Sequence, residues 1–202
     1  MKIGITCFSG VGGSGILATE LGISLANRGV EVHFITSSQP VRLIGQYNDN
    51  IFCHEVGTIN YPVFQHPPYS LCLSVKMAEI ARKYNLDLLH AHYAIPHAAS
   101  AYLAKMMCRE IGLKFITTLH GTDVTLVGSD NSLKSLTKFL IDESDGVTTV
   151  SNHLRDTTRE IFKTNRYIEV LYNFVDTDRF KPITMSEHRK KFAKEHERIL
   201  IH

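Results

Sequence analysis

The chain has 202 residues, of which 44% are hydrophobic and 21% charged, a composition typical of a globular protein with a full core. Its formal net charge of +2 gives no strongly basic surface, so we do not expect a nucleic-acid partner. The sequence contains no apolar run near the roughly 18 residues of a membrane span and no signal-peptide layout, and its cysteines lie far apart (Cys7, Cys53, Cys72, Cys108). We therefore expect reduced thiols and a cytoplasmic location.

The chain begins with an apolar strand at residues 3–7, a glycine-rich turn at residues 9–15, and a helix that starts at Ser14 or Gly15 and ends at Gly29. A turn with so few side chains lets a ligand approach the backbone amides. The unpaired N–H groups and positive dipole end of the helix favour a negatively charged ligand. The sequence therefore predicts a phosphate or carboxylate site at this turn.

Strands and helices alternate along most of the remaining chain. We expect strands at 30–36, 51–56, 86–91, 114–119, 146–150 and 167–171, and helices at about 70–84, 95–108, 133–142 and 151–162. Ser70 and Ser151 are the expected caps of two of these helices. The alternation predicts an α/β fold with a Rossmann-like, doubly wound parallel sheet.

The end of the chain differs from this pattern. Residues 187–198 are charge-dense and are expected to form a helical connector, and residues 199–201 resemble the start of an apolar strand. We expect residues 1–182 to form one Rossmann-like domain. Residues 183–202 would then be a linker and the first strand of a second domain.

The turn at residues 10–15 matches the Gly-x-Gly-x-x-Gly pattern of dinucleotide-binding proteins and has the required position between a strand and a helix. That pattern also needs an acidic residue about 20 positions later, at the end of the second strand, to hold the ribose. Residues 35–39 read Ile-Thr-Ser-Ser-Gln and contain no carboxylate. An NAD(P)-binding oxidoreductase therefore remains an alternative, and another kind of anion-binding loop is favoured.

Several polar side chains follow the predicted strands, where ligands of parallel sheets gather. His90 and His92 could begin a metal site, but no third ligand has suitable spacing, so a packed, hydrogen-bonded pair is favoured and no metal is predicted. His120 precedes a glycine and is favoured as a site residue. Asp123 could cap the next segment or act in chemistry. The sequence lacks the motifs of serine hydrolases, P-loop nucleotide triphosphatases and zinc proteases.

Taken together, these segments resemble the amino-terminal half of a retaining family 4 glycosyltransferase of the GT-B class. The resemblance rests on residues 11–15, 21–22, 29–33, 87–93, 118–123, 145–151 and 173–176. Within that family, residues 91–97 and 119–123 are most similar to the enzymes that make N-acetylglucosaminyl L-malate in bacillithiol biosynthesis.

The resemblance implies substrates and roles for particular residues. It implies that this half carries the acceptor, L-malate, and that the second half carries most of the site for UDP-N-acetylglucosamine. Gly13, Ser14 and Gly15 would face the sugar diphosphate and the acceptor, and His120 would lie beside the transferred sugar. The candidates for malate binding are Ser14, Tyr93, Thr118 and Asn152.

The resemblance also implies a mechanism. Transfer would occur on the face from which UDP departs, without a cofactor or metal, and the chain would be inactive alone. A non-catalytic nucleotide- or anion-binding module is the other alternative, and the sequence leaves homo-oligomerisation open.

Overall fold

The computed structural model describes residues 1–59, 61–182 and 189–200. Within these ranges one sheet contains the strands β1 (Lys2–Thr6), β2 (Glu31–Thr36), β3 (Ile51–Glu55), β4 (Leu88–His92), β5 (Lys114–Leu119), β6 (Gly146–Thr149) and β7 (Glu169–Val170). Their order is β3-β2-β1-β4-β5-β6-β7, and every neighbouring pair is parallel. The Rossmann-like, doubly wound sheet predicted from the sequence is confirmed.

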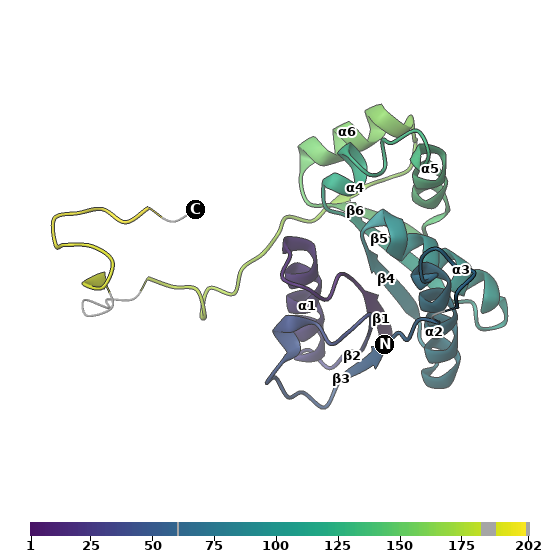
Figure 1. Ribbon diagram of the computed structural model, residues 1–202, viewed down its shortest axis with the longest axis horizontal. Coiled ribbons are helices and arrows are strands. Elements are labelled where there is room, and N and C mark those ends of the chain that lie inside the picture. Colours follow the sequence, from purple (N-terminus) through teal and green to yellow (C-terminus); the bar gives the residue numbers. More distant parts are fainter. Residues whose placement is uncertain (60, 183–188, 201–202) are drawn as a thin grey trace.

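The helices cover both faces of this sheet. They are α1 (Gly13–Ala26), α2 (Tyr69–Tyr84), α3 (Ala99–Met107), α4 (Thr122–Thr125), α5 (Lys134–Glu143) and α6 (Asn152–Phe162), with short helical turns η1 (Val41–Leu43), η2 (Ala94–Ala98) and η3 (Arg109–Ile111). Helix α1 lies on one side of the sheet and helices α2 and α3 lie on the other (Figure 1). In the described part of the chain, no helix is long and apolar enough to cross a membrane.

The core under α1 depends on the alternation of side chains along β1 and β2. Ile3 and Ile5 of β1 pack with Val32 and Phe34 of β2 on the α1 side. Gly22 of α1 lies so close to Phe34 that an added Cβ atom would be 2.3 Å from Phe34 Cζ. The absence of a side chain at Gly22 therefore lets the helix approach the sheet.

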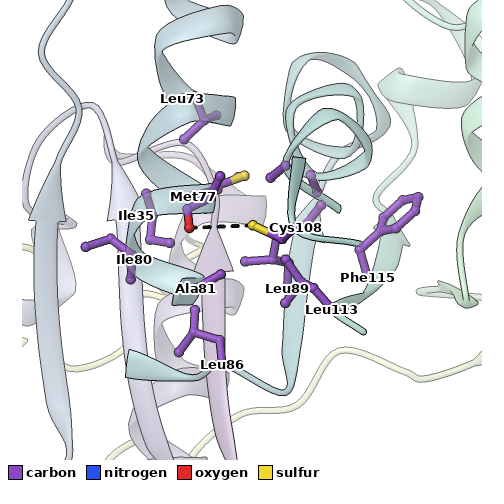
Figure 2. Packing of buried hydrophobic residues seen from close by; sticks show 14 of the residues in the cluster. Ile35, Leu73, Met77, Ile80, Ala81, Leu86, Leu89, Cys108, Leu113 and Phe115 are labelled. Carbon is purple, nitrogen blue, oxygen red and sulfur yellow. Dashed lines mark hydrogen bonds between the residues drawn. The ribbon is translucent and has the colours of Figure 1, made fainter. Parts of the chain in front are cut away.

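The core on the opposite face joins α2 and α3 to the sheet. It contains Ile35, Leu89 and Phe115 from the strands and Leu73 and Met77 from α2 (Figure 2). Leu73, Met77 and Ile80 recur at helical spacing along α2 and are buried there. The Cys108 thiol donates to the carbonyl oxygen of Ala78 over 3.6 Å, which ties the end of α3 to α2 (Figure 2).

Some local predictions were wrong. Ser70 does not cap α2, because the helix begins at Tyr69, so Pro68 occupies the N-cap position and Ser70 lies inside the first turn. Ser151 does cap α6, and its hydroxyl accepts from the Leu154 N–H at 3.1 Å. The short helix α4 was not predicted, because four residues are too few to show a periodic pattern.

The expected connector at residues 187–198 and strand at 199–201 lie partly outside the described residues, namely at 187–188 and at 201. The described residues 189–200 contain turns and irregular chain rather than a continuous helix or a strand. A strand needs a neighbour for its backbone groups, and no described strand pairs with Ile199 or Leu200.

We predict that Gly22→Ala lowers the free energy of unfolding by about 1–3 kcal/mol, because Phe34 is fully buried and cannot move away from the added methyl group. Urea unfolding would measure this change. Gly57→Ala is the matched control, since nothing lies within 4 Å of an added Cβ at Gly57. Equal stability of the two variants would contradict the close packing of α1.

Candidate functional site

The predicted site residues lie at the edge of the sheet where the parallel strands end. Gly13, Ser14 and Gly15 open α1 after β1, Tyr93 follows β4, His120 follows β5 and Asn152 opens α6 after β6. Thr118 lies within β5, paired in register with His92 of β4 and Thr148 of β6. Four separate parts of the chain therefore contribute to one edge, as the sequence predicted.

The first turn of α1 has free backbone donors. The N-cap residue, Gly12, is extended, and no side chain caps the helix. The carbonyl oxygen of Gly12 accepts from the Ile16 N–H at 2.9 Å. No described residue accepts a hydrogen bond from the three preceding amides (Gly13, Ser14, Gly15), and the first turn has no acidic side chain. These amides and the helix dipole can hold a phosphate or carboxylate.

Two glycines of this turn, Gly13 and Gly15, lack a side chain for different physical reasons. Gly15 is buried, and an added Cβ would lie 2.1 Å from the carbonyl oxygen of Phe8, so only glycine lets α1 begin against the end of β1. Gly13 is exposed and nothing lies within 4 Å of an added Cβ. The open surface at the turn is therefore at Gly13, whereas Gly15 shapes the backbone beneath it.

The end of β2 has no acidic residue at the place where dinucleotide-binding proteins hold the ribose. Ser37 and Ser38 lie there instead, and their hydroxyl groups bond Ser9 Oγ at 3.0 and 2.9 Å. The serines link the end of β2 to the glycine turn. This arrangement lacks the carboxylate that would bind a ribose diol.

Beside the turn, His90, His92, His97 and His120 form what we call the histidine cluster. The rings of His90 and His92 lie 4.2 Å apart, centroid to centroid, and those of His92 and His120 lie 5.3 Å apart. His92 Nδ1 is 3.1 Å from His120 Nε2, and His97 Nδ1 donates to the backbone oxygen of His92 at 2.6 Å. The described residues contain no group of three or more side chains placed to hold a metal ion.

Burial keeps the histidine cluster uncharged. Loss of solvent lowers the pKa of His90, His97 and His120 to about 4, and lowers the pKa of His92 well below its usual value of 6.5. Neighbouring imidazoles would add repulsion if any of them became protonated. At neutral pH each ring is therefore neutral, with one nitrogen that donates and one that accepts.

Asp123 is a buried cap rather than a group that faces a ligand. Its Oδ1 accepts from the backbone N–H groups of His120 at 3.0 Å and Gly121 at 2.8 Å, and its side chain is 1% exposed. Burial raises the pKa of this carboxyl group, and the backbone donors partly oppose that effect. Of the two roles left open by the sequence, the structure supports capping. Asp123 thereby fixes the backbone on which His120 is carried.

Thr118 lies below the surface of the site. Its hydroxyl is 2.7 Å from His90 Nε2 and 2.7 Å from Thr148 Oγ1, and the residue is 8% exposed. His90 is thus hydrogen-bonded to Thr118 and not to His92, although the two rings pack together as expected. Thr118 supports the histidine cluster with a hydroxyl that already has two partners.

Tyr93 and Asn152 lie nearer the surface. The Tyr93 hydroxyl hydrogen-bonds Thr122 Oγ1, and its ring lies 6.5 Å from that of His120 and nearly parallel to it. Asn152 is exposed, and its side-chain amide donates to the Tyr172 hydroxyl at 2.7 Å. Tyr93 and His120 are therefore brought together by the ends of β4 and β5, as predicted.

Sequence reasoning missed Phe8 and His97. Phe8 is 46% exposed, and its ring contacts those of Tyr93 at 5.2 Å and His97 at 4.6 Å, centroid to centroid, so it joins the end of β1 to the end of β4. An aromatic residue directly after a buried strand was the available signal for Phe8. His97 lies in the irregular turn η2, whose geometry no periodic pattern reveals.

The chain is similar to known glycosyltransferases. The profile of Glycosyltransferase Family 4 matches residues 11–179. The chain is 53% identical over 203 aligned residues to the N-acetyl-alpha-D-glucosaminyl L-malate synthase of Bacillus anthracis, an alignment that covers all of this chain and 53% of the synthase.

Solved structures of glycosyltransferases are also similar to this chain. A glycosyltransferase from Rickettsia africae has a TM-score of 0.69 and 25% identity, with 94% of this chain and 47% of that chain covered. Anabaena Alr3699/HepE, solved with UDP-glucose, has a TM-score of 0.68 and 15% identity, with 95% and 49% covered. This chain thus spans about half the length of these relatives. The predicted resemblance to the amino-terminal half of GT-B glycosyltransferases is confirmed.

We predict that the free energy of unfolding falls as the pH is lowered from about 6.5 toward 4. Histidines of the unfolded chain take up protons in this range, whereas His90, His97 and His120 stay neutral until about pH 4. The unfolded state therefore binds more protons, and each cluster histidine can cost up to about 1.4 kcal/mol per pH unit. Urea unfolding at a series of pH values would measure the slope.

His90→Gln should reduce this slope, because a neutral amide replaces one buried imidazole. His153→Gln is the control, since His153 is exposed on α6 and lies outside the histidine cluster. A free energy of unfolding that is constant between pH 7 and pH 5 would contradict the neutral histidine cluster.

Proposed function

Because this chain belongs to Glycosyltransferase Family 4, we propose that it forms the acceptor side of an enzyme that transfers N-acetylglucosamine from UDP-N-acetylglucosamine to L-malate in bacillithiol biosynthesis. The observation that carries the proposal is the 53% identity to a curated N-acetylglucosaminyl L-malate synthase along the whole chain. The free amides at the start of α1 support it, because both proposed substrates are anions.

In this proposal the ligands occupy the edge formed by the strand ends. Gly13, Ser14 and Gly15 offer backbone N–H groups to the diphosphate or to a malate carboxylate. Ser14, Tyr93 and Asn152 contact malate. We assign Thr118 a supporting role beneath the acceptor, because its hydroxyl already bonds His90 and Thr148.

His120 would hydrogen-bond the donor as a neutral group. An imidazole whose pKa is lowered to about 4 is too weak a base to remove a proton from the malate hydroxyl at neutral pH. The departing phosphate of UDP would help to take that proton, on the same face of the sugar, which gives retention. The free amides of α1 would stabilise the negative charge that develops on the leaving diphosphate.

We predict transfer activity when this chain is joined to the carboxyl-terminal half of the Bacillus anthracis synthase, and none from the 202-residue chain assayed alone. A single half cannot close over the substrates and exclude water. The measurement is malate-dependent release of UDP, with mass detection of N-acetylglucosaminyl malate. UDP release by the chain alone would contradict the half-site proposal. Failure of the joined protein, if folded, would contradict the assigned reaction.

We also predict that Gly13→Val in the joined protein lowers turnover more than tenfold, because the added side chain projects from the exposed turn into the path of the anion. Unfolding should be unchanged, since nothing lies near the new Cβ. Gly57→Val is a control with similar open space, because Gly57 lies outside the glycine turn, in the loop after the outermost strand β3.

Calorimetry on the chain tests the oxidoreductase alternative with the same Gly13→Val variant. We expect no binding of NADH or NADPH by the unmodified chain, because the end of β2 carries serines and no carboxylate. Micromolar binding that Gly13→Val weakens would favour the oxidoreductase.

A further inference from the structure

The two ring nitrogens of His92 lie in different surroundings. The residue is 3% exposed. Its Nδ1 is 3.1 Å from His120 Nε2, whereas its Nε2 is buried and has no hydrogen-bond partner among the described residues. One ring nitrogen is therefore paired with a residue of the site, and the other is sealed in the interior.

The proton of the neutral His92 ring can occupy either nitrogen. On Nε2 it would create a buried N–H group without an acceptor, and the ring could only accept at Nδ1. On Nδ1 it is donated to His120 Nε2, and the unpaired atom is a lone pair. Buried N–H groups without partners are the rarer of the two in folded proteins. The geometry therefore favours His92 with its proton on Nδ1.

This choice fixes the state of His120. If His120 Nε2 accepts from His92, the single proton of the neutral His120 ring must be on Nδ1. No described residue hydrogen-bonds His120 Nδ1, and the atom is not among the buried polar atoms without partners, so it is accessible. Asp123 holds the backbone of His120 and Gly121 from below, so the ring is held at both its backbone and its Nε2 atom.

We propose that His92 is a positioning residue that holds His120 in its Nδ1–H form, so that the site presents a neutral N–H donor to an oxygen atom of the sugar donor. The identity of that ligand rests on the proposed function above, whereas the position of the proton does not. A merely structural His92 would fill the same space but leave His120 free to exchange between its two neutral forms.

The first test observes the proton directly. In the chain labelled with ¹⁵N at histidine, long-range ¹H–¹⁵N spectra at pH 7 distinguish a protonated from an unprotonated ring nitrogen. We expect His120 to carry its proton on Nδ1. In His92→Phe, which keeps a ring but removes the donor, we expect averaged ¹⁵N shifts of the His120 ring that lie between those of the two neutral forms. A proton on His120 Nε2 in the unmodified chain would overturn the proposal.

His92→Asn provides the rescue variant. The Asn side-chain nitrogen is separated from the backbone by the same number of bonds as His Nδ1, so it can donate to His120 Nε2. We expect His92→Asn to restore the Nδ1–H form. Because Asn is smaller than Phe, recovery with Asn and loss with Phe cannot be explained by the filling of space. The same mixture of forms in both variants would contradict the proposal.

The second test measures turnover in the joined protein, with urea unfolding of each variant. We expect His92→Phe to lower kcat about tenfold, the size expected for one lost hydrogen bond, and His92→Asn to recover most of it. If the ¹⁵N result is as expected but kcat is equal in all variants, the proposed role of the His120 proton in transfer would be overturned. The assignment of that proton to Nδ1 would still hold. Absence of transfer even in the unmodified joined protein would count against the reaction and not against the proton assignment.

Discussion

The common direction of the strands is the constraint on which this structure depends. Because each described strand pair is parallel, every strand from β1 to β6 delivers the residues that follow it to the same edge. The crossover from β3 to β4 then places β4 next to β1, so the aromatic ring after β1 can meet those after β4. The free amides of α1 and the histidine cluster are neighbours for this topological reason.

A second consequence of the sheet is electrostatic. The imidazoles at the strand ends are buried, and the rings of His90, His92 and His120 lie tilted against one another. No acidic side chain among the described residues hydrogen-bonds a ring of the cluster. They therefore form a network of neutral donors and acceptors. The buried Asp123 carboxylate accepts its hydrogen bonds from the backbone N–H groups of His120 and Gly121. The free amides and the dipole of α1 therefore favour an anion at this edge, and the neutral histidine cluster adds no charge there.

Much of the fold and part of the site could be predicted from the sequence. Strands with buried β-branched and aromatic residues, and the glycine turn before α1, gave clear local patterns, so the sheet and the anion site were expected. The pairing of His92 with His120 depends on the register of β4 with β5. Because the two histidines are 28 residues apart in the sequence, no local pattern indicates that they meet. The separate roles of Gly13 and Gly15 also depend on contacts with Phe8 that only the folded backbone defines.

The interior position of β1 in the sheet affects how the protein folds during synthesis. β1 pairs with β2 on one side and with β4 on the other, and the Lys2 N–H donates to the Asp87 carboxylate across 85 residues of chain. During synthesis, β1 and β2 can meet early, but the other edge of β1 stays unpaired until β4 has been translated. At about 5–20 residues per second, that interval is roughly 4–17 s. During this interval the nascent chain exposes the unpaired backbone groups of β1 together with its apolar side chains. Unpaired strand edges of this kind can pair with other chains and so begin misfolding.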